Sequence, residues 1–139
     1  HLLGEPLLHP HLATFLKICE DENLKVIITT NGTLLEKQQD VLINSKSHYK
    51  TVISLHSFEA NDGVNFNKYI DTCLDYVKDA KKDKIVVLRL WNNGGKDSLN
   101  QNIFEKIAKN TIFVLTWMVC ACIMCPQPRC EHHKKVPIV

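Results

Sequence analysis

Apolar residues recur at spacings of three and four along much of the chain and predict four helices. The pattern is clearest in the third helix, whose apolar positions are Phe66, Tyr69, Ile70, Cys73, Leu74 and Val77. The first helix begins after Pro10 with Leu12, Phe15, Leu16 and Cys19 on its apolar face, and the fourth contains Ile103, Phe104, Ile107 and Ala108. The second is expected to begin at Thr33, because Glu36 follows it at the spacing of a capping box.

Three runs rich in β-branched residues predict strands at 24–30, 51–56 and 85–91. The runs are nearly continuous in apolar character, which is typical of strands buried on both faces of a parallel sheet. Asn31-Gly32 ends the first run and Asn92-Asn93 ends the third, and both are turn signals. A further strand is expected at 111–117.

The regular alternation of helices and strands predicts an α/β fold with parallel strands and right-handed crossovers. Only three or four strands are visible, so both edges of this apolar sheet would be unpaired. We therefore expect an incomplete part of a larger barrel or open sheet. The expected organisation is a core at residues 1–110 and a cysteine-rich tail at 111–139.

Composition narrows the classes of partner. The chain has 139 residues, 45% of them hydrophobic and 23% charged, as in one globular domain. Its net charge of +2 is scattered, which disfavours nucleic acid and anionic membranes as partners. The apolar stretch at 112–125 is shorter than the roughly 20 residues of a membrane span. The start lacks a Met, a basic leader and a cleavage pattern, so we expect the chain to begin inside a longer gene product.

Cys19 and Cys73 stand alone on apolar helix faces. This placement indicates reduced thiols in a cytoplasmic protein rather than a disulfide framework.

Unusual polar residues gather where the predicted strands end. They are Gly4-Glu5-Pro6 before the first helix, Thr30-Asn31-Gly32 after the first strand, Ser54 and His56 in the second strand, and Arg89 in the third. In parallel α/β folds the carboxyl ends of the strands form the ligand site. A turn alone would require only Gly, Asn or Asp, so the Ser, His and Arg favour a binding edge.

These residues carry a resemblance to a known family. Gly4-Glu5-Pro6-Leu7-Leu8-His9-Pro10 is followed by Thr30-Asn31-Gly32-Thr33-Leu34 and then by Ile53-Ser54-Leu55-His56. In order and spacing, the segment from Leu3 to Trp91 resembles the core of a radical S-adenosylmethionine (SAM) enzyme. The resemblance implies a partial (β/α)6, TIM-like barrel, with His1 near the end of its second strand.

The resemblance also implies roles for the first motif. In this family a Gly-Gly-Glu-Pro segment offers backbone groups to the methionine amino group of SAM, so Gly4 and Glu5 would take that role and Pro6 would fix the turn. Leu3 stands where the first Gly of the motif usually stands. The alternative for Gly4-Glu5-Pro6 is an ordinary turn between a strand and a helix.

Further contacts with SAM are implied on the next two strands. Ser54 and His56 would contact its ribose or carboxylate, and Arg89 could pair with the carboxylate through two hydrogen bonds. The alternatives are that His56 is a satisfied rim histidine and that Arg89 points to solvent. Thr30 and Asn31 are interpreted as shaping the floor of the site or its turn rather than taking part in chemistry. The histidines His9, His11 and His48 are interpreted as structural or exposed.

Family chemistry implies a second cofactor. Radical SAM enzymes reductively cleave SAM to a 5′-deoxyadenosyl radical at a [4Fe-4S] cluster held by a Cys-x3-Cys-x2-Cys loop, which would precede His1 here. This chain alone would then be inactive. The resemblance further implies an electron donor such as flavodoxin or ferredoxin, and a substrate that is a small molecule or a peptide.

The tail offers a separate set of metal ligands. Cys120, Cys122, Cys125 and Cys130 are followed by His132-His133, a set that suits zinc or an auxiliary iron-sulfur cluster. An incidental cysteine-rich end and a segment read out of frame are the alternatives. Two other functions therefore remain open: a non-catalytic α/β module that binds a small metabolite, and a zinc-binding interaction domain.

Overall fold

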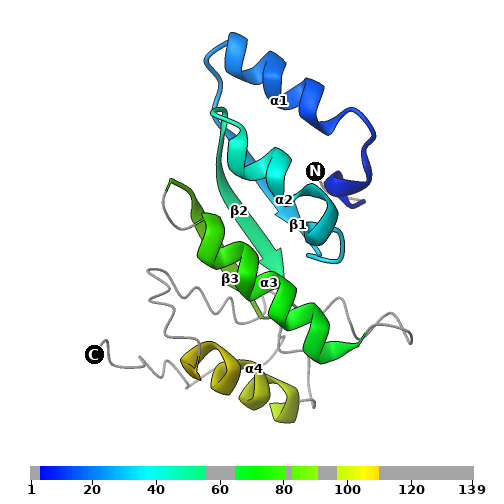
Figure 1. Ribbon diagram of the computed structural model, residues 1–139, viewed down its shortest axis with the longest axis vertical. Coiled ribbons are helices and arrows are strands. Elements are labelled where there is room, and N and C mark those ends of the chain that lie inside the picture. The colour runs from blue at the N-terminus through cyan, green and yellow to red at the C-terminus, as the bar shows by residue number, and fades with distance from the viewer. Residues whose placement is uncertain (1–3, 56–64, 81–82, 91–96, 110–139) are drawn as a thin grey trace, which may run out of the picture.

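The computed structural model describes residues 4–55, 65–80, 83–90 and 97–109. Helices and strands alternate along these residues (Figure 1). The elements are η1 (Pro6–Leu8), α1 (Leu12–Asp21), β1 (Val26–Thr30), α2 (Leu35–Asn44), β2 (His48–Ser54), α3 (Phe66–Ala80), β3 (Ile85–Arg89) and α4 (Asp97–Lys109). The expected strand at 111–117, and the tail as a whole, lie outside the described residues.

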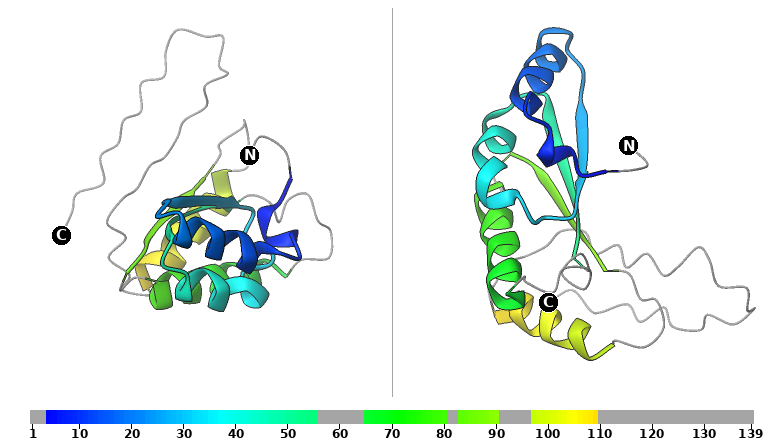
Figure 2. Two further views of the ribbon diagram at one scale, coloured as in Figure 1. Left: turned by 90° about the horizontal axis from the view of Figure 1, so that it is seen from above. Right: turned by 90° about the vertical axis from the view of Figure 1, so that its right-hand side faces the viewer.

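The three described strands form one parallel sheet in the order β1-β2-β3. This order and direction confirm the predicted α/β fold. Helices α1, α2 and α3 lie side by side along one face of the sheet (Figure 2). Ser54 pairs with Arg89 in the register of β2 and β3, so the last residues of these two strands are direct neighbours.

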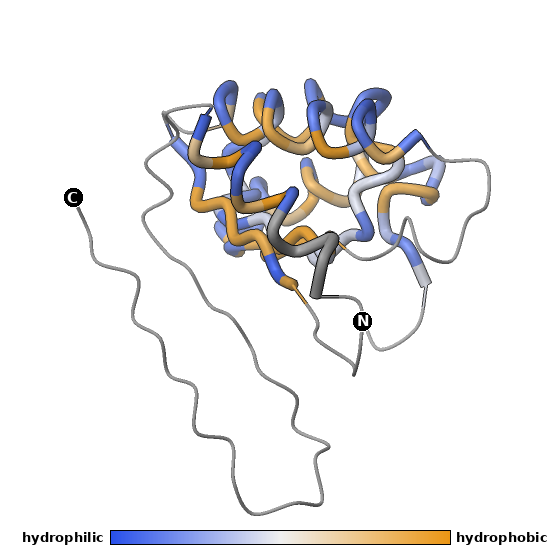
Figure 3. Tube along the Cα trace, turned by 90° about the horizontal axis from the view of Figure 1, so that it is seen from below, coloured by the Kyte–Doolittle hydropathy of each residue, from blue (hydrophilic) through white to orange (hydrophobic). Residues whose placement is uncertain are grey.

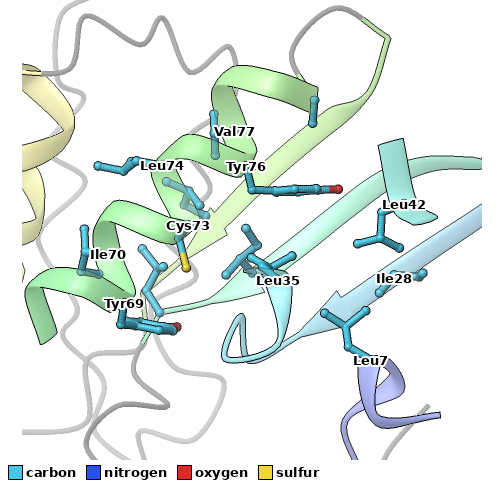
Figure 4. Packing of buried hydrophobic residues seen from close by; sticks show 14 of the residues in the cluster. Leu7, Ile28, Leu35, Leu42, Tyr69, Ile70, Cys73, Leu74, Tyr76 and Val77 are labelled. Carbon is cyan, nitrogen blue, oxygen red and sulfur yellow. The ribbon is translucent and has the colours of Figure 1, made fainter. Parts of the chain in front are cut away.

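Alternation along the strands divides the sheet into two faces. Ile28, Ile53 and Leu88 are buried and pack with the apolar residues of the helices in one cluster. Figure 3 colours each residue by its hydropathy, and the apolar residues of the helices lie on the sides that face the sheet. Helix α3 contributes most to this core and packs against α2 and β3. Figure 4 shows its buried side chains in one cluster with Leu35 and Leu42 of α2 and Ile28 of β1.

Some predicted boundaries were wrong. Strand β2 begins at His48, three residues before the expected start, because the polar side chain of His48 is buried with hydrogen-bond partners. Helix α2 begins at Leu35, its N-cap is Leu34, and no side chain caps it. The expected capping box is absent at this helix because the Thr33 hydroxyl donates to Asn31 Oδ1 at 2.7 Å.

The apolar face predicted for α1 is only partly buried. Leu12 and Leu16 lie in the core, whereas Phe15 and Ile18 are 49% and 52% exposed. Ile27 of β1 is also exposed, and β1 pairs only with β2 among the described strands. These features agree with the expectation of an unpaired sheet edge. In the part of the chain that the structure describes, every helix is too short or too polar to cross a bilayer.

Candidate functional site

The carboxylate of Glu5 joins the first motif to the end of β1. It accepts hydrogen bonds from Thr30 Oγ1 at 2.7 Å and from the Asn31 amide at 2.7 Å. It also accepts the Leu7 amide at 3.0 Å and thereby caps the short helix η1. A carboxylate with three donors is a strong anchor, because hydrogen bonds to a charged acceptor are stronger than neutral ones. The Glu5 side chain therefore fixes the position of residues 4–6 at this edge.

The turn after β1 is built by local side-chain to backbone bonds. Thr30 Oγ1 accepts the Gly32 amide at 3.0 Å, and Asn31 Oδ1 accepts the Thr33 amide at 2.9 Å. Such bonds are typical of Asx turns. Gly32 has a φ of +80°, and a Cβ there would lie 3.0 Å from Cys73 Sγ and from Ile53 Cγ2. Both the conformation and the packing therefore require glycine at position 32.

The backbone at Gly4 is different, because the surroundings are open. Gly4 has a φ of +103°, but a Cβ at this position would meet nothing within 4 Å. Pro6, as the first residue of η1, fixes the turn that follows. Residues 4–6 thus present an ordered backbone next to open space at the carboxyl end of the sheet.

Ser54 and Arg89 are the last residues of β2 and β3, and both are half-buried. The alternation of the strand places Ser54 on the face opposite to Ile53 and Leu55, which belong to the core under the helices. The Leu55 amide donates to the Arg89 carbonyl at 3.0 Å and continues the sheet to this edge. A hydroxyl and a guanidinium therefore share the face that the described helices leave uncovered. His56 lies outside the described residues.

Tyr69 of α3 is a site residue that the sequence interpretation missed. Its hydroxyl donates to the Asn31 carbonyl at 2.7 Å, and the Ser54 carbonyl lies 3.3 Å from the same oxygen. Burial raises the pKa of Tyr69, so the hydroxyl keeps its proton and remains a donor. In the helical pattern of the sequence, this tyrosine was interpreted only as one of the apolar positions of α3. The available signal was that a buried tyrosine hydroxyl needs a partner.

The described cysteines do not form a metal site. Cys19 lies half-buried on α1, and Cys73 is buried on α3, where burial raises the pKa of its thiol to about 12. Among the described residues, no group of three or more His, Cys, Asp or Glu side chains could hold a metal ion. These residues therefore do not fit a [4Fe-4S] cluster. The candidate ligands Cys120, Cys122, Cys125 and Cys130 lie outside the described residues.

His9, His11 and His48 are placed as interpreted from the sequence. His9 and His11 are exposed, and the His9 ring packs against His11 and Phe15. His48 is buried at the opposite, amino end of the sheet. A hollow between α1 and α2 lies in the helix layer, away from the carboxyl edge, and is lined by Leu16, Glu20, Asp40, Val41, Asn44 and Ser45 among others.

Taken together, the carboxyl edge is suited to binding. It offers an ordered backbone at Gly4 and Glu5, the hydroxyl of Ser54 and the guanidinium of Arg89. These groups can bind the amine and the carboxylate of a ligand. The Cys73 thiol lies against Gly32 at this edge, but burial raises its pKa to about 12, so it is a poor nucleophile.

No family model and no curated protein matches the sequence. Solved structures do match the fold. Streptococcus suis SuiB bound to S-adenosylmethionine aligns over 78% of this chain and 26% of SuiB, with 23% sequence identity and a TM-score of 0.56. SuiB bound to its precursor peptide SuiA aligns equally well, over 25% of that chain. Archaeal TYW1 aligns over 76% of this chain and 37% of TYW1, with 23% identity and a TM-score of 0.52.

Both neighbours are radical SAM enzymes, and this chain spans well under half the length of each. At this level of identity the likeness is one of fold. The parallel sheet, its helix layer and the order of its elements are those of part of a TIM-like radical SAM barrel.

Proposed function

We propose that this chain is the SAM-binding part of a radical SAM enzyme. Gly4 and Glu5 bind the methionine amino group through their backbone, and Pro6 fixes the turn that presents them. Ser54, His56 and Arg89 bind the ribose and the carboxylate. In the whole enzyme, cysteines upstream of His1 would hold a [4Fe-4S] cluster, which would supply the electron for reductive cleavage of SAM to a 5′-deoxyadenosyl radical.

One observation carries this proposal: residues 4–6 are held at the same edge of the sheet as Ser54 and Arg89. The Glu5 carboxylate fixes them to the end of β1, and the register of the sheet continues from β1 through β2 to β3. The open space beside Gly4 allows a ligand to approach this backbone. The fold shared with SuiB, which has been solved with SAM, supports SAM as the ligand.

The partners are proposed by the same reasoning. The substrate is a small molecule or a peptide, the latter because SuiB has been solved with its precursor peptide. The electron donor is a flavodoxin or a ferredoxin. We place the enzyme in the cytoplasm, where the thiols of Cys19 and Cys73 stay reduced.

The direct test is SAM binding and cleavage by the full-length protein that contains this chain. Isothermal titration calorimetry should detect SAM binding, and Ser54→Ala should weaken it by about 0.5–1.5 kcal/mol, the value of one hydrogen bond. After anaerobic iron-sulfur reconstitution and reduction with dithionite, the wild-type protein should form 5′-deoxyadenosine.

Two controls separate the proposal from its alternatives. The 139-residue chain alone should form no 5′-deoxyadenosine after the same treatment, and a positive result would make the tail cysteines the cluster ligands. A full-length protein that binds neither SAM nor iron would contradict the proposed function and favour a non-catalytic module for another small metabolite. Unchanged SAM affinity in Ser54→Ala would remove Ser54 from the site.

A further inference from the structure

Two tyrosines of α3 point toward the sheet at a separation of two helical turns. Tyr69 and Tyr76 are 5% and 0% exposed, and both hydroxyls have hydrogen-bond partners (Figure 4). Their partners differ in kind. The Tyr76 hydroxyl lies 2.6 Å from the side-chain oxygen of Thr51, within β2. The Tyr69 hydroxyl reaches the backbone beyond β1 and at the end of β2.

Tyr69 connects the two residues that follow the last paired residues of β1 and β2, Thr30 and Ile53. The Asn31 carbonyl, at 2.7 Å, is its main acceptor, and the Ser54 carbonyl, at 3.3 Å, shares the same proton. A side chain that joins two backbone groups fixes the distance between them, because neither carbonyl can move away without losing its donor. The Tyr69 hydroxyl therefore holds Asn31 and Ser54, each one residue beyond the last pair of the β1–β2 ladder, at a fixed spacing.

Rigid packing beneath this hydroxyl prevents it from following either carbonyl. A Cβ on Gly32 would lie only 3.3 Å from the Tyr69 oxygen and 3.0 Å from Cys73 Sγ, so the turn, the tyrosine and the cysteine are in close contact. The Cys73 thiol and the Tyr69 hydroxyl both lie against Gly32. The ring is thus held on several sides, and its hydroxyl acts as a fixed point.

The contacts of Tyr69 complete a continuous connection along the carboxyl edge. Glu5 joins the first motif to Asn31, Tyr69 joins Asn31 to Ser54, and the Leu55 amide joins β2 to the Arg89 carbonyl. Each segment proposed to contact SAM is therefore linked to the next. Tyr69 provides the middle link from outside the sheet.

We propose that Tyr69 is a positioning residue, whose hydroxyl holds the ends of β1 and β2 at the spacing that the ligand site requires. This inference rests on the proposed function, because the ligand of that site is SAM. Tyr69 itself lies on the helix side of the sheet, with the core residues, and acts through the backbone of Asn31 and Ser54.

The test compares Tyr69→Phe with Tyr76→Phe in the full-length protein. Each variant removes one buried hydroxyl from the same helix and keeps the aromatic ring. Tyr69→Phe should weaken SAM binding roughly 2- to 12-fold, which corresponds to the loss of one hydrogen bond. It should also accelerate amide hydrogen exchange around Asn31 and Leu55 in the absence of ligand. Tyr76→Phe should change neither measurement at these positions.

Each outcome decides the inference. Both variants are measured at a temperature at which circular dichroism shows them folded. If Tyr69→Phe leaves affinity and exchange at wild-type values, or if Tyr76→Phe reduces SAM affinity equally, Tyr69 has no positioning role. If the wild-type protein binds no SAM, the proposed function is wrong. In that case accelerated exchange in Tyr69→Phe alone would still show that Tyr69 orders the two strand ends, and unchanged exchange would refute this as well.

Discussion

The polar side chains at the amino end of the sheet are buried in one hydrogen-bonded network, whereas the polar groups at the carboxyl end lie next to the open space at Gly4. Ser47, His48 and Thr51 are buried near the start of β2 and are hydrogen-bonded to neighbouring groups. Thr51 Oγ1 lies 3.0 Å from His48 Nε2 and 2.6 Å from the Tyr76 hydroxyl. Lys84 covers this end by donating to the backbone carbonyls of Ser45 and His48. The network is closed, as expected of buried polar groups that serve stability.

The carboxyl end has a comparable number of polar groups in a different arrangement. Glu5 and Tyr69 bind backbone atoms of other segments, and Asn31 Oδ1 accepts the Thr33 amide within its own turn. Gly4, next to Glu5, borders open space. Both ends satisfy their polar side chains. The difference is that the hydrogen bonds at the carboxyl end order residues next to open space, as a preorganised ligand site would require.

The largest expected effect concerns an apolar residue at the carboxyl end. Leu55 is 1% exposed and lies in the core, directly after Ser54. Leu55→Ala should lower the free energy of unfolding by about 2–5 kcal/mol, because it opens a cavity. SAM affinity of the folded variant should change little. Urea denaturation measures the first quantity and calorimetry the second.

Leu8→Ala is the matched control, because Leu8 is 70% exposed. This variant should change the free energy of unfolding by no more than about 0.5 kcal/mol. If Leu55→Ala lowered SAM affinity without destabilising the protein, the two faces of β2 would be reversed and Ser54 would be withdrawn from the site.

An intermediate effect is expected for the anchor of the first motif. In Glu5→Gln the side-chain amide nitrogen would face one of the three donors that the carboxylate now accepts. The variant should lose about 1–3 kcal/mol of stability, the cost of a buried donor without its acceptor. Thermal unfolding measures this loss.

Glu36→Gln is the corresponding surface control. Glu36 is exposed and forms an ion pair with exposed Lys68 at 3.4 Å, which should contribute less than about 1 kcal/mol. Equal losses of stability in Glu5→Gln and Glu36→Gln would show that Glu5 stabilises the protein no more than an exposed carboxylate does. The Glu5 carboxylate would then not be an anchor of the carboxyl end.

The smallest effect is the pH dependence of the amino end. Burial, with a smaller contribution from Lys84, lowers the pKa of His48 below its usual 6.5, although hydrogen bonds to the Leu42 and Lys50 carbonyls oppose the change. The unfolded chain therefore binds a proton at a higher pH than the folded chain. The contribution of neutral His48 to the free energy of unfolding should be complete above pH 6.5. The free energy of unfolding should fall as the pH drops below 6.5, by at most about 1.4 kcal/mol per pH unit.

Urea denaturation between pH 7.5 and pH 5 checks this expectation, with His48→Gln as the control that removes the titrating group. The fall should be smaller in the variant. Stability that rose toward pH 5 in the wild-type protein would mean that His48 is protonated in its buried position, and the amino end would then be a charged site.

Much of the fold could be predicted from the sequence because each element has a strong local signal. The β-branched runs gave β1, β2 and β3, and the periodicity of residues 66–77 gave α3. Boundaries failed where a polar side chain is buried with partners, as at His48. The capping box failed because Asn31 competes for the hydroxyl of Thr33. These are tertiary or competing local contacts that residue types alone do not reveal.

The candidate site was only partly predictable. Residues 4–6, Ser54 and Arg89 could be placed at one edge because parallel strands bring their carboxyl ends together. The alternation of β2 predicted that Leu55 faces the core, and its burial in the core cluster confirmed this. The side-chain role of Glu5 and the role of Tyr69 could not be foreseen, since both depend on partners far away in the sequence.

The separation of those partners has a consequence for the order of folding. The bonds that shape the carboxyl edge join residues that are 25, 26 and 38 positions apart in the chain. Contacts at such separations form only after the intervening chain has lost the entropy of loop closure. During synthesis, the edge cannot take its final form until α3 has left the ribosome and docked. We therefore expect ligand competence to appear only after α3 has docked, and later than the local turns of the first motif.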